Sequence, residues 1–490
     1  MLRKVRLTLA VAFFVCVTAL FLDFTGTLHH WLGWMAKIQL LPAVMALNVG
    51  VVLGLVALTL VFGRIYCSVI CPLGVLQDVI SWLSGRRKAK KYRFSYSPAK
   101  QWLRYGVLAL FVAAMAAGVG SVVALLAPYS SFGRIAQNLF SPVYLWLNNA
   151  LALVAEHAGS YAIYGRDVWL RSLPTFVIAA VTLVALAVLA WRGSRTYCNT
   201  ICPVGTVLGL LARFSWLKVR IDADKCSGCS LCSRGCKASC IDYKNHTVDY
   251  SRCVACGDCI GRCRKQAITY GPAVKSKAET ADTARRTFLL GAAVATTSAV
   301  IAQEKKKVDG GLAVIVDKVA PERATPLTPP GSLSASNMAR HCTACQLCVS
   351  ACPNDVLRPS AGLLTLMQPT MSYERGYCRP ECTRCGEVCP AGAITPITRA
   401  EKSATQIGHA VWIKKNCIPL TDGVECGNCA RHCPVGAITM VAADPSNPDS
   451  HMIPAVNTAR CIGCGACENL CPARPFSAIY VEGHEVHRTV

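Results

Sequence analysis

The stretch CSGCSLCSRGC, residues 226–236, has four cysteines at the spacing C-x2-C-x2-C-x3-C, and CVACGDCIGRC, residues 253–263, repeats that spacing. Three thiolates at these intervals reach three corners of one [4Fe–4S] cube, whereas the fourth reaches a neighbouring cube. Each group therefore lends its last cysteine to the other. We expect two clusters with these ligands: Cys226, Cys229, Cys232 and Cys263 for the first, and Cys253, Cys256, Cys259 and Cys236 for the second.

Four more cysteine groups lie between residues 335 and 490, and each ends in Cys-Pro. They are Cys342, Cys345, Cys348 and Cys352; Cys378, Cys382, Cys385 and Cys389; Cys417, Cys426, Cys429 and Cys433; and Cys461, Cys464, Cys467 and Cys471. Zinc is an alternative, but zinc sites usually consist of two CxxC knuckles. Disulfides are another, yet every cysteine of this region falls into a cluster group. The spacing favours iron, and six [4Fe–4S] clusters in all.

A different repeat reads RIYCSVICPLGV at residues 64–75 and RTYCNTICPVGT at residues 195–206. Each copy places two cysteines one helical turn apart, directly after an apolar run. Four thiolates are the ligand number of one more [4Fe–4S] cluster. The candidate ligands of this seventh cluster are Cys67, Cys71, Cys198 and Cys202. Redox-active disulfides or a docking surface are the alternatives. Cys240 is a spare thiol or an alternative ligand for Cys236.

Four apolar runs approach the ~20 residues that cross hydrocarbon as a helix. They lie at residues 7–24, 40–62, 105–126 and 175–191. The net charge is +24, and Lys and Arg cluster in residues 64–104 rather than in residues 128–173. The positive-inside rule then places Met1 and the first of these loops in the cytoplasm and the second outside. Because the basic surplus belongs to the membrane half and basic–aromatic motifs are absent, nucleic acid is not an expected partner.

The segment TARRTFLLGAAVATTSAVIAQ, residues 283–303, joins paired arginines to a short apolar run. It fits a short fifth span, and it also resembles a twin-arginine export signal, either cleaved or retained as an anchor. Both interpretations place the following residues outside. Residues 304–334 contain Pro and Gly and are expected to form a tether.

Clusters on both sides of a membrane require a route across ~30 Å of hydrocarbon. The ten histidines lie outside the expected spans and no CxxCH motif occurs, so haem is not expected. Walker A and Rossmann glycine patterns are also absent, which argues against nucleotides. A membrane quinone is the simplest bridge, with a partner subunit as the alternative. Groups for a quinone headgroup near the outer face are His29, His30, Trp31 and Trp34, for which an interfacial aromatic belt is the simpler explanation.

With these motifs, residues 1–284 resemble the membrane polyferredoxin subunit of the quinol dehydrogenase that feeds periplasmic nitrate reductase. Residues 283–490 resemble its partner, an exported four-cluster ferredoxin with a twin-arginine leader. The resemblance implies a fusion with an α-helical membrane domain, of four spans plus a fifth anchor or signal helix, and two bacterial ferredoxin-like α+β iron–sulfur domains. The expected boundaries are 1–192 and 193–284 for the spans and first ferredoxin domain, 285–303 for the signal or anchor, 304–334 for the linker, and 335–490 for the second ferredoxin domain.

The outer cysteine groups also resemble those of four-cluster ferredoxin subunits of respiratory oxidoreductases. There the first and fourth groups exchange ligands, as do the second and third. The resemblance thus implies Cys471 as the fourth ligand of the first group, Cys433 of the second, Cys389 of the third and Cys352 of the fourth.

The resemblance implies an electron-transfer protein of the bacterial inner membrane, with the N-terminus and first ferredoxin domain cytoplasmic and the C-terminal domain periplasmic. Electrons would pass from quinol or an acidic cytoplasmic donor to a periplasmic reductase or cytochrome in anaerobic respiration. The resemblance implies an electron-transfer component that can form part of a quinol dehydrogenase, and no catalytic residues are expected. The alternative is a redox-linked assembly, maturation or regulatory polyferredoxin for a periplasmic metalloenzyme.

Overall fold

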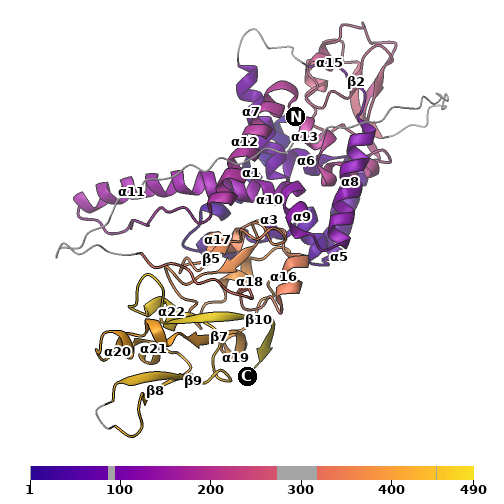
Figure 1. Cartoon of the computed structure of the whole chain (residues 1–490). Helices are drawn as coiled ribbons and strands as arrows, with labels where there is room; N and C mark the ends of the chain where they lie inside the picture. Colours follow the sequence, from indigo (N-terminus) through magenta and orange to yellow (C-terminus); the bar gives the residue numbers. More distant parts are fainter. Residues whose placement is uncertain (1, 87–93, 273–316, 448–449, 490) are drawn as a thin grey trace.

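The computed structural model describes residues 2–86, 94–272, 317–447 and 450–489. In Figure 1 a bundle of helices forms the middle of the molecule, and cysteine-rich units lie at opposite ends of it. Residues 217–272 form the inner unit, and residues 317–489 form the outer domain. The expected signal or anchor helix at 285–303 lies outside the described residues.

The bundle contains apolar helices of very different length. The longer ones are α1 (Leu2–Leu22), α5 (Val49–Phe62), α8 (Gln101–Ala116), α11 (Ser141–His157) and α12 (Leu173–Gly193). The short ones include α2 (Thr27–Leu32), α3 (Trp34–Lys37), α4 (Leu40–Met45) and α9 (Gly120–Leu126). Among the described residues, Arg3–Leu22 and Leu173–Gly193 are long and apolar enough to cross a membrane, judged by length and composition. Both expose apolar side chains, such as Val15 and Val184.

The expected spans at 40–62 and 105–126 are each divided into two helices. The first is interrupted after α4, where Leu47 has φ 51°, and the second after α8, where Gly118 has φ 72°. A residue in the left-handed region commonly ends a helix. The second break also allows the outer domain to pack closely against the bundle. The glycine at position 120 makes this approach possible, because a Cβ there would lie 2.8 Å from the Ala339 carbonyl oxygen.

The two CxxxCP repeats fold in the same way. The first forms α6 (Ile65–Val69) and α7 (Pro72–Gly85), and the second forms α13 (Thr196–Thr200) and α14 (Pro203–Ala212). In both, the second cysteine is extended and caps the following helix, with proline at the first helical position. Proline is favoured there because its fixed φ suits the first turn and the missing N–H has no intrahelical partner.

Residues 128–140 differ from the external loop that the charge pattern predicts. They form α10 (Pro128–Ile135) and the π-helix η2 (Ala136–Phe140), and every residue of α10 is buried. α10 contacts α7 and α12 inside the bundle. Arg134 Nη1 donates there to the Ala124 carbonyl at 2.7 Å, whereas Tyr129 Oη, Ser130 Oγ and Arg134 Nε have no hydrogen-bond partner among the described residues. This segment therefore re-enters the bundle rather than lying outside it.

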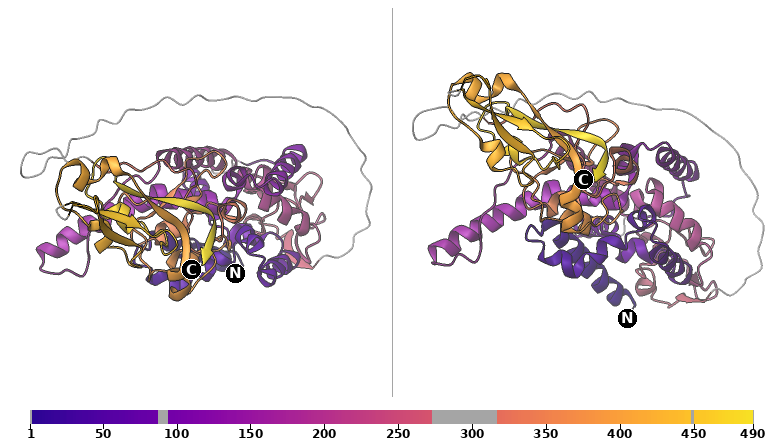
Figure 2. Two further views of the ribbon diagram at one scale, coloured as in Figure 1. Left: turned by 60° about the horizontal axis from the view of Figure 1, so that its bottom comes forward. Right: turned by 90° about the horizontal axis from the view of Figure 1, so that it is seen from below.

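Helix α11, which follows this segment, projects away from the body in Figure 1 and in both views of Figure 2. Its exposed side chains include Trp146, Leu147 and Val154. An exposed apolar helix of this kind is typical of a segment that lies at a membrane surface.

The inner unit is built from two antiparallel strand pairs with the cysteine groups between them. β1 (Leu217–Ile221) pairs with β4 (Ile268–Pro272), and β2 (Ile241–Asp242) forms a hairpin with β3 (Thr247–Val248). Short helices α15 (Leu231–Arg234) and η3 (Ile260–Arg262) lie within the first and second groups, respectively. The hairpin separates the first group from the second and turns the chain back, so that the two groups face each other.

The outer domain repeats the hairpin between two cysteine groups twice in succession, and its second half adds an outer strand pair. Its first half has α16 (Ala335–His341), α17 (Leu347–Ala351), the hairpin β5 (Leu357–Pro359)–β6 (Pro369–Met371), α18 (Arg384–Val388) and α19 (Arg399–Ala404). Its second half has β7 (Thr405–Trp412), η4 (Lys414–Asn416), α20 (Ile418–Thr421), α21 (Asn428–Arg431), the hairpin β8 (Ile438–Ala442)–β9 (Met452–Val456), α22 (Ala466–Leu470) and β10 (Ile479–Thr489), which pairs with β7. Each half places one hairpin between two cysteine groups.

A single apolar core joins the bundle to the outer domain. It extends from the CxxxCP cysteines through Tyr129 and Phe132 to Leu347 and Val349 beside the first outer group. Gly133 makes the close approach, since a Cβ there would lie 2.3 Å from the Cys345 carbonyl oxygen. The inner unit has a separate small core. The outer domain is thus packed into the bundle and is not a loosely tethered module.

Candidate metal centres

The first inner cysteine group lines a cavity of about 210 Å³ together with the last cysteine of the second group. The four thiols are Cys226, Cys229, Cys232 and Cys263, the set that the spacing assigns to one cluster. The Ala267 amide donates a hydrogen bond to Cys263 Sγ at 3.2 Å. Amide donors to sulfur are among the groups that set a cluster potential.

The second inner group is brought together with Cys236, as the spacing also predicts. Cys253, Cys256 and Cys259 each interact electrostatically with Cys236. Cys240 Sγ lies 3.5 Å from Cys236 Sγ and also contacts the Cys253 thiol. Its hydrogen bond lowers the pKa of the Cys236 thiol to about 7. Cys240 therefore lies between two candidate ligands of one cluster.

In the outer domain the exchange of last cysteines differs from the one that the resemblance implies. Cys389 lies beside the first group, Cys342, Cys345 and Cys348. Cys352 lines one cavity with the second group, Cys378, Cys382 and Cys385. Cys471 lines another with the third group, Cys417, Cys426 and Cys429. Cys433 lies beside Cys461 and Cys464, and the remaining member of that fourth group is Cys467. Neighbouring groups exchange ligands, and the expectation of exchange between the first and fourth and between the second and third groups is corrected.

The hairpins are the physical reason for this correction. β5–β6 turns the chain back between the first and second groups, and β8–β9 does so between the third and fourth. Cys352 and Cys433, each followed by a hairpin, therefore meet the group that comes next along the chain, and Cys389 and Cys471 meet the group before their own. The inner unit has the same hairpin in the same place. The connections between successive outer groups are nearly equal in length, so the sequence does not indicate which of these groups exchange ligands.

Combined substitutions test which cysteines share a cluster. Cys417→Ser should remove one cluster, about four iron atoms per chain. Adding Cys471→Ser should remove no further iron, because both residues serve the same cluster. Adding Cys389→Ser instead should remove a second cluster. Iron and acid-labile sulfide analysis of the purified chains measures this, and the opposite pattern would restore the exchange between the first and fourth groups and between the second and third.

The four CxxxCP cysteines meet at one buried place in the bundle. Every pair among Cys67, Cys71, Cys198 and Cys202 lies within electrostatic range, and each of these residues is 4% exposed. Within the described residues, no group of three or more His, Cys, Asp or Glu side chains is spaced to hold a single metal ion. A [4Fe–4S] cube places its ligand sulfurs farther apart than one ion does.

Two arginines connect the repeats crosswise. Arg64, which opens the first repeat, donates from Nη2 to the Cys198 carbonyl at 3.1 Å. Arg195, which opens the second, donates from Nη1 to the Cys67 carbonyl at 2.6 Å. Both are fully buried. Each repeat thus contributes an arginine that holds the backbone of the other repeat's first cysteine.

The glycine that ends each repeat makes room for this crossing. A Cβ on Gly74 would lie 2.6 Å from Arg195 Nη1, and a Cβ on Gly205 would lie 2.8 Å from Arg64 Nη2. Each would also lie 2.3 Å from the carbonyl oxygen of the first cysteine in its own repeat. The arginine, cysteines, proline and glycine of the pattern R-x-Y-C-x3-C-P-x-G therefore each have a structural role. Sequence reasoning used only its cysteines, although both copies carry the arginine and the glycine.

The two arginines differ in their charge balance. Arg195 binds Asp78 through Nη2 at 2.8 Å and through Nε at 3.0 Å. Among the described residues, Arg64 donates instead to Asn199 Oδ1 and the Ser251 carbonyl, both at 2.9 Å. Its Nη2 also lies 3.7 Å from Cys67 Sγ, and its buried Nε has no partner. A buried cation favours an anionic counterpart, so the site fits a negatively charged thiolate-ligated cluster.

The same site lies between the inner unit and the outer domain. On the inner side, Arg64 contacts Ser251 and interacts with Cys253 of the second inner group. On the outer side, Arg134 of α10 lies within electrostatic range of both Tyr197, beside Cys198, and Cys345 of the first outer group. Buried side chains thus connect the CxxxCP site to a cysteine group on each side.

The histidine and tryptophan side chains near the outer end of α1 do not form one shared site. His29 Nδ1 lies 3.1 Å from Asp23 Oδ2, and the His29 side chain is buried. Trp31 and Trp34 are exposed, and the ring of His30 contacts that of Trp31 edge on. The structure does not bring these four side chains together around one cavity.

Several protein families with iron–sulfur descriptions match this chain. A 4Fe-4S binding domain family matches residues 44–91 and again residues 173–222, so each match contains one CxxxCP repeat. Two 4Fe-4S dicluster domain families match residues 424–474 and 249–356. The last range joins two cysteine groups that the structure places in different units. No solved structure matches the chain.

Ferredoxin-type proteins are among the most similar curated relatives. Ferredoxin-type protein NapF of Escherichia coli K12 is 30% identical over 161 residues, which are 32% of this chain and 87% of NapF. Methylamine utilization ferredoxin-type protein MauM of Methylobacillus flagellatus is 31% identical over 165 residues, 33% of this chain and 70% of MauM. An uncharacterized protein of Methanocaldococcus jannaschii is 22% identical over 284 residues, 56% of this chain and 88% of that protein.

Proposed function

The chain belongs to the family of ferredoxin-type 4Fe–4S proteins, and we propose that it carries single electrons across a bacterial inner membrane between a quinol or cytoplasmic donor and a periplasmic oxidoreductase. It is an iron–sulfur electron-transfer protein with several 4Fe–4S-binding domains. Bound clusters supply one-electron redox chemistry. The protein's own contribution is to hold them in series, keep water away from them and balance their charge.

The observation that carries this proposal is the position of the CxxxCP site. Its four thiols are buried between the inner unit and the outer domain, with Arg64 reaching one side and Arg134 the other. Four thiols in a closed, cation-lined site suit a seventh [4Fe–4S] cluster, and the family match over each repeat supports that assignment. A continuous series of buried groups would then carry electrons across the hydrocarbon, a route for which the sequence identifies no carrier within this chain.

The proposed orientation rests on the charge pattern and on exposed apolar surface. Lys and Arg are concentrated around the inner unit and the loop at 64–104, which favours the cytoplasmic side. The apolar outer faces of α1 and α12 and the projecting α11 suit contact with lipid. The outer domain then lies in the periplasm. Its second half is farthest from the bundle in Figure 1, where a periplasmic partner could approach.

Electron transfer across quinone-free liposomes tests the proposal. The full chain is reconstituted with ferricyanide trapped inside, and dithionite is added outside. We expect the trapped ferricyanide to be reduced continuously and far faster than in protein-free liposomes, because the chain alone connects the two sides. A rate equal to that of protein-free liposomes would overturn the relay, and a single electron equivalent per chain without turnover would favour a maturation or regulatory role.

A further inference from the structure

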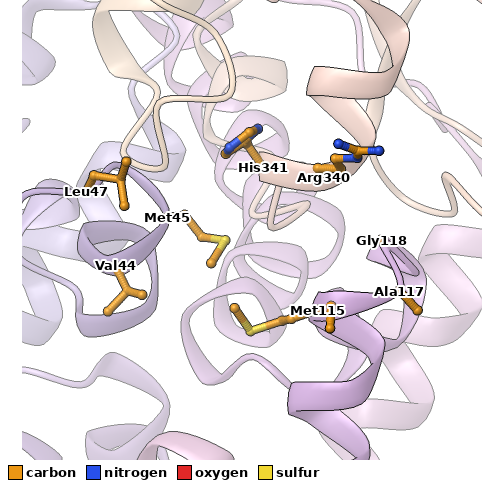
Figure 3. A pocket seen from close by; sticks show the side chains of 9 residues that line it. Val44, Met45, Leu47, Met115, Ala117, Gly118, Arg340 and His341 are labelled. Carbon is orange, nitrogen blue, oxygen red and sulfur yellow. The ribbon is translucent and has the colours of Figure 1, made fainter.

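A cavity of about 570 Å³ opens where the bundle meets the outer domain (Figure 3). Its walls are mainly apolar: Met45 at the end of α4 and Met115 near the end of α8 face each other across it. Arg340 and His341, the last two residues of α16, lie on the side of the outer domain. The cavity thus has an apolar body and polar groups on one side.

The two divided helices create this space. α4 ends before Leu47 and α8 ends before Gly118, and both of these residues line the cavity. At each break the chain turns away, so that two adjacent helix ends leave a gap which α16 covers. The breaks in the two expected spans therefore together produce this cavity.

The polar side of the cavity lies directly beside a candidate cluster ligand. His341 precedes Cys342, the first cysteine of the first outer group. His341 Nδ1 lies 3.0 Å from the Asn337 carbonyl oxygen and donates to it, which leaves Nε2 free to accept a hydrogen bond. Arg340 is exposed and offers guanidinium donors. A ligand oxygen bound here would be next to the start of the outer cluster series.

The opening of the cavity is surrounded by exposed apolar side chains. Leu47 is 82% exposed and Val49 is 65% exposed, and Val44 is partly exposed. In the membrane orientation proposed above, lipid rather than water would cover this face. The shape therefore suits an amphipathic molecule that arrives from the bilayer with its polar end first.

We propose that this cavity binds the headgroup of a membrane quinone, an inference that rests on the proposed relay function. The volume lies within the roughly 300–1,000 Å³ of small-molecule sites. Methionine side chains adapt to flat apolar rings, and the hydrogen-bonding groups lie only at the end next to the cluster ligand. Oxidation of one bound quinol breaks two O–H bonds, sends two protons to water past Arg340, and passes two electrons singly to the iron–sulfur clusters of the outer domain.

This site differs from the headgroup position that the sequence suggests at His29, His30, Trp31 and Trp34. His29 is held by Asp23, and none of these side chains lines the cavity. The cavity instead combines residues from both halves of the chain. A site of that kind forms only when the outer domain is docked on the bundle.

The experiment fills the cavity with a bulky side chain. Met115→Trp should slow the reduction of the clusters by a short-chain quinol at least about tenfold, which corresponds to about 1.4 kcal/mol. Met45→Trp fills the same space from the opposite wall and should act alike. The full chain in lipid nanodiscs is used, and cluster absorbance reports the reduction. Equilibrium binding of a quinone analogue to the oxidised chain is measured in parallel and should weaken equally.

Leu110→Trp is the matched control, because Leu110 lies on the same helix α8 and is exposed without lining the cavity. It should leave quinol-driven reduction unchanged. Dithionite-driven reduction of trapped ferricyanide should be unchanged in all three variants, which separates this site from the relay itself. Unchanged quinone binding in both Met variants, or a phospholipid retained in the cavity in place of quinone, would overturn the proposal.

Discussion

Replacing Cys67 and Cys198 with serine should remove one [4Fe–4S] cluster, about four iron atoms per chain, and should stop electron transfer across liposomes. One thiolate from each repeat is lost, and a buried serine hydroxyl is a poor substitute for a thiolate ligand. The remaining clusters of the inner unit and outer domain keep all their ligands. Iron and sulfide analysis measures the first effect, and reduction of trapped ferricyanide measures the second.

Cys16→Ser is the matched control, since Cys16 lies on α1 and belongs to none of the cysteine groups. It should change neither the iron content nor the transfer rate. If the double variant keeps its iron, the four thiols do not hold a cluster, and the redox-active disulfide remains the explanation. If iron falls but transfer continues at the original rate, the electrons cross the bundle by another route.

The candidate ligands could be found in the sequence because cluster chemistry is local. Three thiolates must come from one short loop, so their spacing identifies them without knowledge of the fold. The fourth ligand comes from elsewhere, and its identity depends on which groups are folded together. For Cys236 and Cys263 the neighbouring group was the evident choice, and the structure places them so. For Cys389 the resemblance implies the third group and for Cys471 the first, whereas the structure places Cys389 with the first group and Cys471 with the third.

The bundle shows a different limit of sequence reasoning. Hydropathy measures how apolar a stretch is and does not detect where a helix is interrupted, so the breaks at Leu47 and Gly118 were not predicted. Residues 128–140 contain Ser, Asn, Gln and Arg and therefore resemble an external loop. They are nevertheless buried, and some of their polar groups find partners inside the protein, such as Asn138 Nδ2, which lies 2.9 Å from Gln346 Oε1 of the outer domain. Such pairing depends on the tertiary structure.

The charge asymmetry of the two crossing arginines leads to a second large effect. Both hold the carbonyl of a first cysteine in the opposite repeat, so their backbone roles are equivalent. Within the part of the chain that the structure describes, Arg195 forms an ion pair with Asp78 and Arg64 forms none; Asp78 also lies 3.6 Å from Arg6 and 3.8 Å from Lys237. The positive charge of Arg64 is therefore available to stabilise added negative charge at the CxxxCP thiolates. A reduced cluster carries one more negative charge than an oxidised one, so Arg64 should raise the potential of a cluster held there.

Arg64→Gln should lower the potential of the CxxxCP-held cluster by roughly 120 mV. A unit charge about 6 Å away at an effective dielectric constant of about 20 contributes roughly 3 kcal/mol, and about 1.4 kcal/mol corresponds to 59 mV for one electron. The comparison variant is Arg195→Gln with Asp78→Asn, which removes the equivalent hydrogen bond together with a balanced ion pair. Its potential should change far less. Redox titration followed by electron paramagnetic resonance measures both variants, and equal shifts would mean that loss of the hydrogen bond, not of the charge, determines the potential.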